Sequence, residues 1–190
     1  MKKLTPLLVV ALSACSSPNV AQNSIANDFR GIAFGSSVSS GMQFESTYAD
    51  GYDRIKNYTK HNEEFAFGHV EAQKIIYSYF DGKLYNVDIT VGEDGRCLNA
   101  KALADGLSKK YGSQLEQIIP NAELNNKFYL KKFRNLHVSV MCNAVFSKNG
   151  IAETYVSISE PRLSEFATQY EDSVLKDILS SSSSKISSDF

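Results

Sequence analysis

The strongest constraint on the fold is the pair Asp81-Gly82, which separates two segments rich in aromatic and β-branched residues, 72–80 and 84–91. Asp-Gly favours the two-residue turns that join antiparallel strands, because both positions tolerate a positive φ. The second segment alternates, so one of its faces is buried and the other meets solvent. The pattern predicts a β-hairpin in an antiparallel sheet, with Tyr85, Val87, Ile89 and Val91 on the buried face and Asn86, Asp88 and Thr90 on the wet face.

A helix and a second group of strands follow the hairpin. Apolar residues recur at helical spacing over 99–111, where Asn99 is placed to cap the helix start. Segment 136–146 alternates like the hairpin, and Asn149-Gly150 is a second turn signal. The sequence predicts an α+β fold, an antiparallel sheet with hairpins and one or two packed helices, in an order compatible with two tandem β-β-β-α units. The other expected elements are a loop or short helix at 43–48, an edge strand at 127–133, a return strand at 152–159 and a helix from Pro161 to about Leu179.

The N-terminus has the layout of a secretory signal. Two lysines precede a short apolar run, Leu4–Leu12, which is about half of the ~20 residues that a membrane-spanning helix needs. The motif Leu12-Ser13-Ala14-Cys15 resembles the lipobox of bacterial lipoproteins. That resemblance implies cleavage before Cys15, attachment of lipid to its thiol and, from Ser16 beside it, sorting to the outer membrane. An ordinary secretory signal that contains a cysteine is the alternative.

These features divide the chain into four parts. Residues 1–14 are expected to be a lipoprotein signal peptide, and residues 15–27 the lipidated cysteine and a flexible tether. Residues 28–179 are expected to form a single α+β domain, and the Ser-rich residues 180–190 to be disordered. The domain opens with DFRGIAFG, which is similar to the start of several uncharacterised bacterial lipoproteins and brings no known activity with it.

Charge and cysteine count limit the classes of function. The formal net charge of −1 lacks the basic excess of a dedicated nucleic-acid-binding protein, so no nucleic-acid partner is expected. With Cys15 assigned to lipid, Cys97 and Cys142 remain. Because an exported domain meets an oxidising compartment, one disulfide between them is the simplest interpretation. Two free buried thiols or a redox pair are the alternatives, although no C-x-x-C motif supports redox chemistry.

The segment HNEEFAFGHVE gathers imidazole and carboxylate groups, which are the ligand types that suit zinc. On a strand, His61, Glu63 and His69 occupy positions of one face and could converge on a divalent metal ion. The protein would then be a metal-dependent hydrolase of the envelope. The spacing is not the H-E-x-x-H of helical zinc sites, and a solvated strand edge with protective charges explains the same residues.

Aromatic residues are concentrated in the polar segment FESTYADGYDRIKNY. Tyrosine in a loop is a favoured recognition residue, because its ring offers contact area and its hydroxyl a hydrogen bond at low entropic cost. The candidate recognition surface therefore consists of Phe44, Tyr48, Tyr52 and Tyr58. The alternative is a loop whose aromatic rings pack back on the sheet.

No motif of the sequence defines a catalytic centre, since a G-x-S-x-G nucleophile elbow is missing and the cysteines are assigned elsewhere. We therefore expect a non-enzymatic, membrane-anchored envelope lipoprotein that needs no cofactor and acts as a protein-binding or assembly module. Its expected location is the bacterial outer membrane, and its expected partners are the lipid bilayer, through acylated Cys15, and an envelope protein. A periplasmic inhibitor or immunity-type lipoprotein is the alternative with the same sequence profile.

Overall fold

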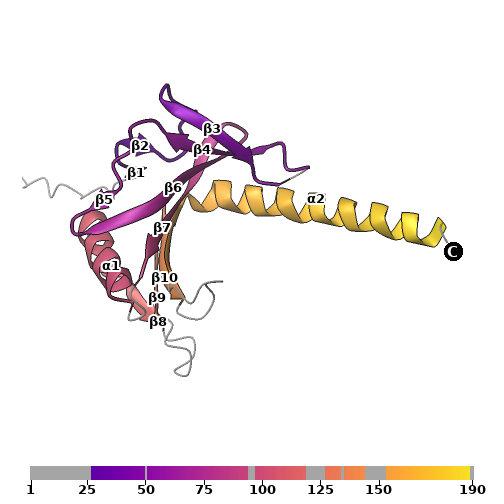
Figure 1. The fold of residues 1–190 in the computed structure, drawn as a ribbon. Helices are drawn as coiled ribbons and strands as arrows, with labels where there is room; N and C mark the ends of the chain where they lie inside the picture. The colour runs from indigo at the N-terminus through magenta and orange to yellow at the C-terminus, as the bar shows by residue number, and fades with distance from the viewer. Residues whose placement is uncertain are drawn as a thin grey trace, which may run out of the picture.

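The computed structural model describes residues 27–49, 51–93, 97–118, 127–133, 135–143 and 153–188. Within these residues the chain forms eleven strands and two helices (Figure 1). The strands are β1 (Asp28–Phe29), β2 (Ile32–Ala33), β3 (Met42–Thr47), β4 (Ile55–Lys60), β5 (Ala66–Phe67), β6 (Val70–Phe80), β7 (Lys83–Gly92), β8 (Glu116–Ile118), β9 (Lys127–Lys132), β10 (His137–Asn143) and β11 (Glu153–Ser159); the helices are α1 (Leu98–Tyr111) and α2 (Pro161–Ser188).

Nine of the described strands form one antiparallel sheet. Its order is β3-β4-β6-β7-β11-β10-β9-β8, and β5 pairs with β6 off this path. The other two described strands, β1 and β2, form a small hairpin of their own. The predicted α+β class is therefore confirmed.

The Asp81-Gly82 turn joins β6 to β7 as the sequence predicts. Both residues have a positive φ, 49° for Asp81 and 73° for Gly82. Phe80 pairs with Lys83 across the turn, so the connection has two residues. These are the dihedral signs that a type I′ turn requires, which explains why Asp-Gly stands here.

A β-bulge interrupts β7 close to this turn. Ser78 pairs with Asn86, whereas the next residue, Tyr79, pairs with Leu84, so Tyr85 has no residue opposite. The bulge turns the Tyr85 side chain to the face of Asn86 and away from the buried face on which the alternating pattern placed it. Tyr85 is still only 8% exposed, because it packs in a separate cluster against α2.

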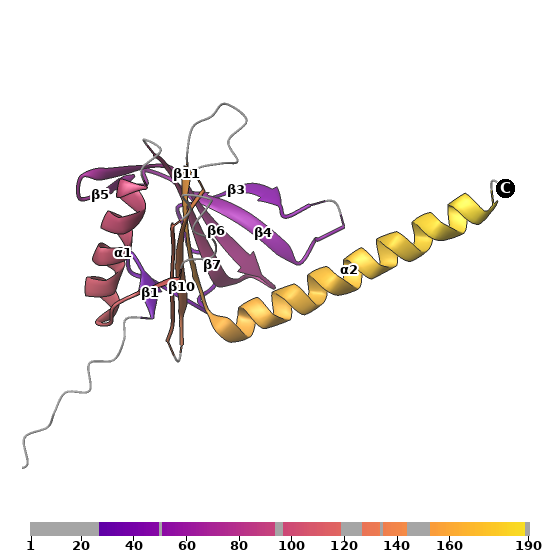
Figure 2. The ribbon, with the colours of Figure 1, turned by 90° about the horizontal axis from the view of Figure 1, so that it is seen from below.

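The two helices cover opposite faces of the sheet (Figures 1 and 2). The larger core lies under α1, which buries Ala100, Leu103, Ala104, Leu107 and Tyr111 there. The first turns of α2 cover part of the other face. Each helix follows three strands that are neighbours in the sheet, β4, β6 and β7 before α1 and β9, β10 and β11 before α2, although further strands belong to each half. Because the helices lie on opposite faces, the two halves are not repeats of one structural unit.

The helix α2 extends past the end near Leu179 that the sequence predicts. It runs through Ser188 and includes most of segment 180–190, for which disorder was the wrong expectation. Ser180 and the serine after it donate their hydroxyls to the carbonyl oxygen of Asp177 one turn earlier. Such bonds let short polar side chains be part of a helix. In both views α2 projects away from the sheet (Figures 1 and 2).

Two local expectations are also wrong. Segment 43–48, expected as a loop or short helix, lies mostly in β3, which is a strand because it pairs with β4. Segment 127–133 contains β9 but not the edge of the sheet, because β8 pairs with the outer side of β9. The turn Asn149-Gly150, the expected signal peptide and Cys15 lie outside the described residues. None of the described helices is both long and apolar enough to cross a membrane.

Candidate functional site

The four residues of the candidate recognition surface form two separate pairs. Phe44 packs edge-on against Tyr58 with ring centroids 5.8 Å apart, and Tyr48 packs edge-on against Tyr52 at 5.5 Å. The outer ring of each pair, Phe44 or Tyr48, is 54% exposed. Tyr58 packs against the main core, whereas Tyr52 packs on Tyr170 of α2. The pairs therefore lie on opposite faces of the sheet, and the four residues do not make one continuous surface.

Tyr48 lines a hollow of about 420 Å³ between α2 and the face of the sheet that α2 partly covers. Side chains of β6 and β7 form its floor, and Glu171 of α2 forms a wall. We call this feature the acidic hollow. The lining residues are Tyr48, Asn57, Ile76, Ser78, Tyr85, Asn86, Asp88 and Glu171.

Hydrogen bonds between neighbouring strands fix the polar floor of the acidic hollow. Ser78 donates to Asn57 Oδ1 at 2.9 Å, and Ser157 donates to Asn86 Oδ1 at 2.8 Å. Asn86 in turn donates through Nδ2 to Asp88 Oδ2 at 2.7 Å. The Asp88 carboxylate is therefore held in one orientation, and Asp88 remains exposed to solvent.

Two carboxylates face the acidic hollow, Asp88 from the sheet and Glu171 from α2. Crowding by protein atoms raises the pKa of Asp88, although hydrogen bonds act in the opposite direction. Burial also raises the pKa of Glu171, and the nearby charge of Asp172 adds to that effect. In the part of the chain that the structure describes, neither carboxylate has an ion-pair partner. The pKa of Tyr48 is raised as well, and the nearby charge of Glu171 is the largest of several causes.

This arrangement suits a cation. A guanidinium or ammonium group that enters the hollow and reaches Asp88 or Glu171 would form charge-assisted hydrogen bonds with carboxylate oxygens that have no cationic partner among the described residues. The ring of Tyr48 beside them adds a face on which an organic cation is attracted. The acidic hollow can therefore hold the end of a lysine or arginine side chain.

The metal candidates are not assembled as a ligand set. Glu63, whose side chain is 4% exposed, accepts hydrogen bonds from the Arg30 guanidinium at 2.6 Å and from the Tyr77 hydroxyl at 2.5 Å. His61 and His69 are exposed. No group of three or more His, Cys, Asp or Glu side chains among the described residues is placed to hold a metal ion. Glu63 therefore stabilises the fold through Arg30 and Tyr77.

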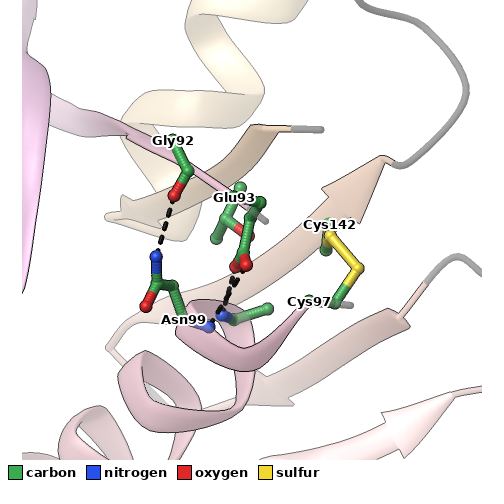
Figure 3. The surroundings of a disulfide bond; sticks show 7 residues. Gly92, Glu93, Cys97, Asn99 and Cys142 are labelled. Atoms are coloured by element: carbon green, nitrogen blue, oxygen red, sulfur yellow. Dashed lines mark hydrogen bonds between the residues drawn. A yellow bond between two sulfur atoms is a disulfide. The ribbon is translucent and has the colours of Figure 1, made fainter. Parts of the chain in front are cut away.

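The two remaining cysteines meet at the start of α1 (Figure 3). A disulfide joins Cys97 to Cys142 with Cα atoms 5.8 Å apart, and ties α1 to β10. Cys97 adopts a left-handed conformation, with φ of 56°, and makes no side-chain cap hydrogen bond. The predicted pairing is the one that the structure contains.

Glu93 rather than Asn99 caps α1 (Figure 3). The Glu93 carboxylate accepts the backbone N–H groups of Asn99 at 3.3 Å and Ala100 at 2.7 Å, and the hydroxyl of Thr154 at 2.6 Å. The side chain of Asn99 instead donates to the carbonyl of Gly92 at 2.8 Å. Asn99 could not be the cap because it already lies inside the helix, which begins at Leu98. No local pattern in the sequence marks this role, since Glu93 precedes the helix by several positions.

Most of the acidic hollow has no local signal in the sequence. The alternating pattern places Asp88 and Asn86 correctly on the solvent-facing side of β7, but nothing in it brings Glu171 near them. That proximity depends on the β-bulge at Tyr85 and on the packing of α2. Comparison with protein-family models, curated proteins and solved structures finds no match to this chain.

Proposed function

We propose that this protein is a non-enzymatic binding protein of the bacterial envelope that holds a partner protein by a basic side chain. The acidic hollow is the binding site, and acylated Cys15 is the membrane anchor. The observation that carries the binding role is the pair of carboxylates, Asp88 and Glu171, that share a hollow without a cation among the described residues. The anchor is supported by the lipobox resemblance of residues 12–15.

Binding at this site has a clear electrostatic basis. A hollow of like charge between protein walls raises the local concentration of cations and speeds their association. A lysine or arginine of the partner would enter between the sheet and α2, and the exposed ring of Tyr48, which packs on Tyr52, would supply contact area beside it. The site thus provides a charged anchor point with an aromatic rim.

The side-chain geometry also favours binding over catalysis. A nucleophile needs a base within hydrogen-bonding distance and a third group that orients the base. Among the described residues, none of the histidines shares a side-chain hydrogen bond with a serine, a cysteine or a carboxylate. The polar bonds around the acidic hollow instead fix acceptor groups in place, as a binding site requires.

A capture experiment tests the proposed function. The tagged full chain is expressed in a bacterial envelope, cross-linked and purified, and co-purifying proteins are quantified for wild type, the Asp88→Asn/Glu171→Gln double variant and the control Glu165→Gln. Glu165 lies on the same helix and is exposed, and it accepts a long hydrogen bond of 3.4 Å from Gln169. We expect the partner to be lost about tenfold or more in the double variant, which corresponds to about 1.4 kcal/mol, and to remain with the control. Equal capture by the double variant and the wild type contradicts the proposal.

The anchor needs a separate test, because binding and attachment are independent. Cys15→Ala should release the protein from the membrane fraction and remove any acyl label, while capture of the partner by the solubilised protein persists. A Cys15→Ala protein that stays in the membrane fraction would dispose of the lipid anchor and leave the binding role standing.

A further inference from the structure

A second cavity lies on the other face of the sheet, between α1 and the short strands β1 and β5. Its volume is about 640 Å³, within the range of small-molecule sites. In both views α1 lies beside these two strands, and α2 lies on the opposite side of the sheet (Figures 1 and 2). The cavity, which we call the α1 pocket, is thus separate from the acidic hollow.

The walls of the α1 pocket are apolar. Phe29 of β1 and Phe67 of β5 face one another with ring centroids 6.3 Å apart, and Leu103 and Leu107 of α1 line the opposite wall. Gly106 lies between these two leucines, and a Cβ atom added there would meet no atom within 4 Å. A glycine in a helix interior costs about 1 kcal/mol relative to alanine, and at this exposed place in the pocket lining it leaves the space beside α1 free of a side chain.

The rim of the α1 pocket is basic. Lys109, Lys110, Arg30 and His69 line it, against one acidic residue, Asp105, whose carboxylate is paired with Lys101 at 2.7 Å. The Arg30 charge is likewise offset by Glu63. Lys110 stacks over the Phe29 ring at 5.7 Å and makes a long contact of 3.5 Å with Asp28, and Lys109 is exposed. Two ammonium groups therefore stand at the opening of an apolar cavity.

We infer that the α1 pocket binds a single-chain fatty acid, with the hydrocarbon chain between the phenylalanines and the leucines and the carboxylate at Lys109 and Lys110. The apolar walls exclude water from the chain, and the ammonium groups complement the charge of the head group. An uncharged hydrocarbon would make no ionic contact with the lysines. A multiply charged ligand without a hydrocarbon chain would not contact the apolar walls. The inference does not depend on the acidic hollow or on the proposed partner.

The test uses the full chain carrying Cys15→Ser, which bears no acyl group of its own. Binding of decanoate, undecanoate and dodecanoate is measured by calorimetry below their micelle concentrations. Because burial of one methylene is worth about 0.8 kcal/mol, Kd should fall about fourfold with each added carbon. The methyl ester of dodecanoate should bind tenfold more weakly or worse than dodecanoate. Equal binding of the ester and the acid, or a Kd that ignores chain length, overturns the inference.

Variants at Gly106 and at the lysines locate the site. Gly106→Leu fills the pocket and should abolish dodecanoate binding, whereas Gly106→Ala, the matched control for helix propensity, should retain it. Lys109→Gln with Lys110→Gln should reduce the affinity for dodecanoate to that of the methyl ester. The thermal unfolding midpoint of Gly106→Leu checks that the variant folds, and we expect it to equal or exceed that of the wild type. If a folded Gly106→Leu protein binds dodecanoate as the wild type does, or if an apolar peptide binds where dodecanoate does not, the inference is overturned.

Discussion

Replacing Glu93 by alanine should destabilise the protein far more than its place in a polar loop suggests. The Glu93 carboxylate accepts two backbone N–H groups at the start of α1 and the hydroxyl of Thr154, a residue that is 0% exposed. Loss of a helix cap costs about 1 kcal/mol. A buried hydroxyl left without a partner costs roughly 1–3 kcal/mol more. The expected loss of unfolding free energy is therefore about 2–4 kcal/mol.

The assay is urea unfolding followed by circular dichroism, with the disulfide kept oxidised. A 3 kcal/mol loss also corresponds to a fall in Tm of about 9 °C for a domain of this size. Glu93→Gln, which keeps one acceptor oxygen, should lose about half as much. The matched control is Glu116→Ala, since the Glu116 side chain is 72% exposed and pairs with Lys131, a surface contact worth about 0–1 kcal/mol. Equal losses for Glu93→Ala and Glu116→Ala would refute the capping role.

Three further predictions concern Glu63, Asp88 and the cysteines. Glu63→Ala should cost about 2–4 kcal/mol in urea unfolding, since it leaves the buried Tyr77 hydroxyl without its acceptor and removes the carboxylate partner of Arg30, which keeps only backbone carbonyls. A chelator should not change the wild-type Tm, and a Tm that falls on chelation would restore the metal hypothesis. Because the pKa of Asp88 is raised on folding, its ionisation opposes folding at pH 7, so Asp88→Asn should be more stable than wild type there. That gain in stability should vanish as the pH falls below the ordinary aspartate pKa of 3.8, where the carboxyl is protonated in both the folded and the unfolded state. Unfolding curves that show Asp88→Asn to be less stable than wild type at pH 7 would contradict this prediction. Reduction of the Cys97–Cys142 bond, which spans 45 residues, should lower the free energy of unfolding by about 3–4 kcal/mol. Thiol counting on the unfolded, unreduced Cys15→Ser chain checks the bond, and two reactive thiols would show that it does not form.

Local sequence signals predicted the parts of the fold that depend on near neighbours. Asp81-Gly82 specifies its own turn through two positive φ angles, and the alternation in β7 identified a sheet with one buried face. The apolar spacing of α1 predicted the helix within one residue of its observed bounds. In each case the residues that carry the signal also make the contacts.

Features that depend on distant pairing were not predictable in this way. Segment 43–48 has no strand pattern of its own and becomes part of β3 only because β4 offers a partner. The acidic hollow needs the β-bulge at Tyr85 and the packing of α2 on the face away from α1, and neither follows from periodicity. Composition suggests disorder beyond Leu179, whereas α2 continues to Ser188 there.

The central claim is that Asp88 and Glu171 bind a basic side chain of a partner protein. The most direct measurement is a double-mutant cycle on the captured partner, which combines Asp88→Asn/Glu171→Gln with neutralisation of each lysine and arginine that cross-linking places near Tyr48. We expect one basic residue to show a coupling energy of about 1.5 kcal/mol or more with the carboxylate pair, in the range measured for close charge pairs across interfaces. Coupling energies near zero for every basic residue at the contact would contradict the claim.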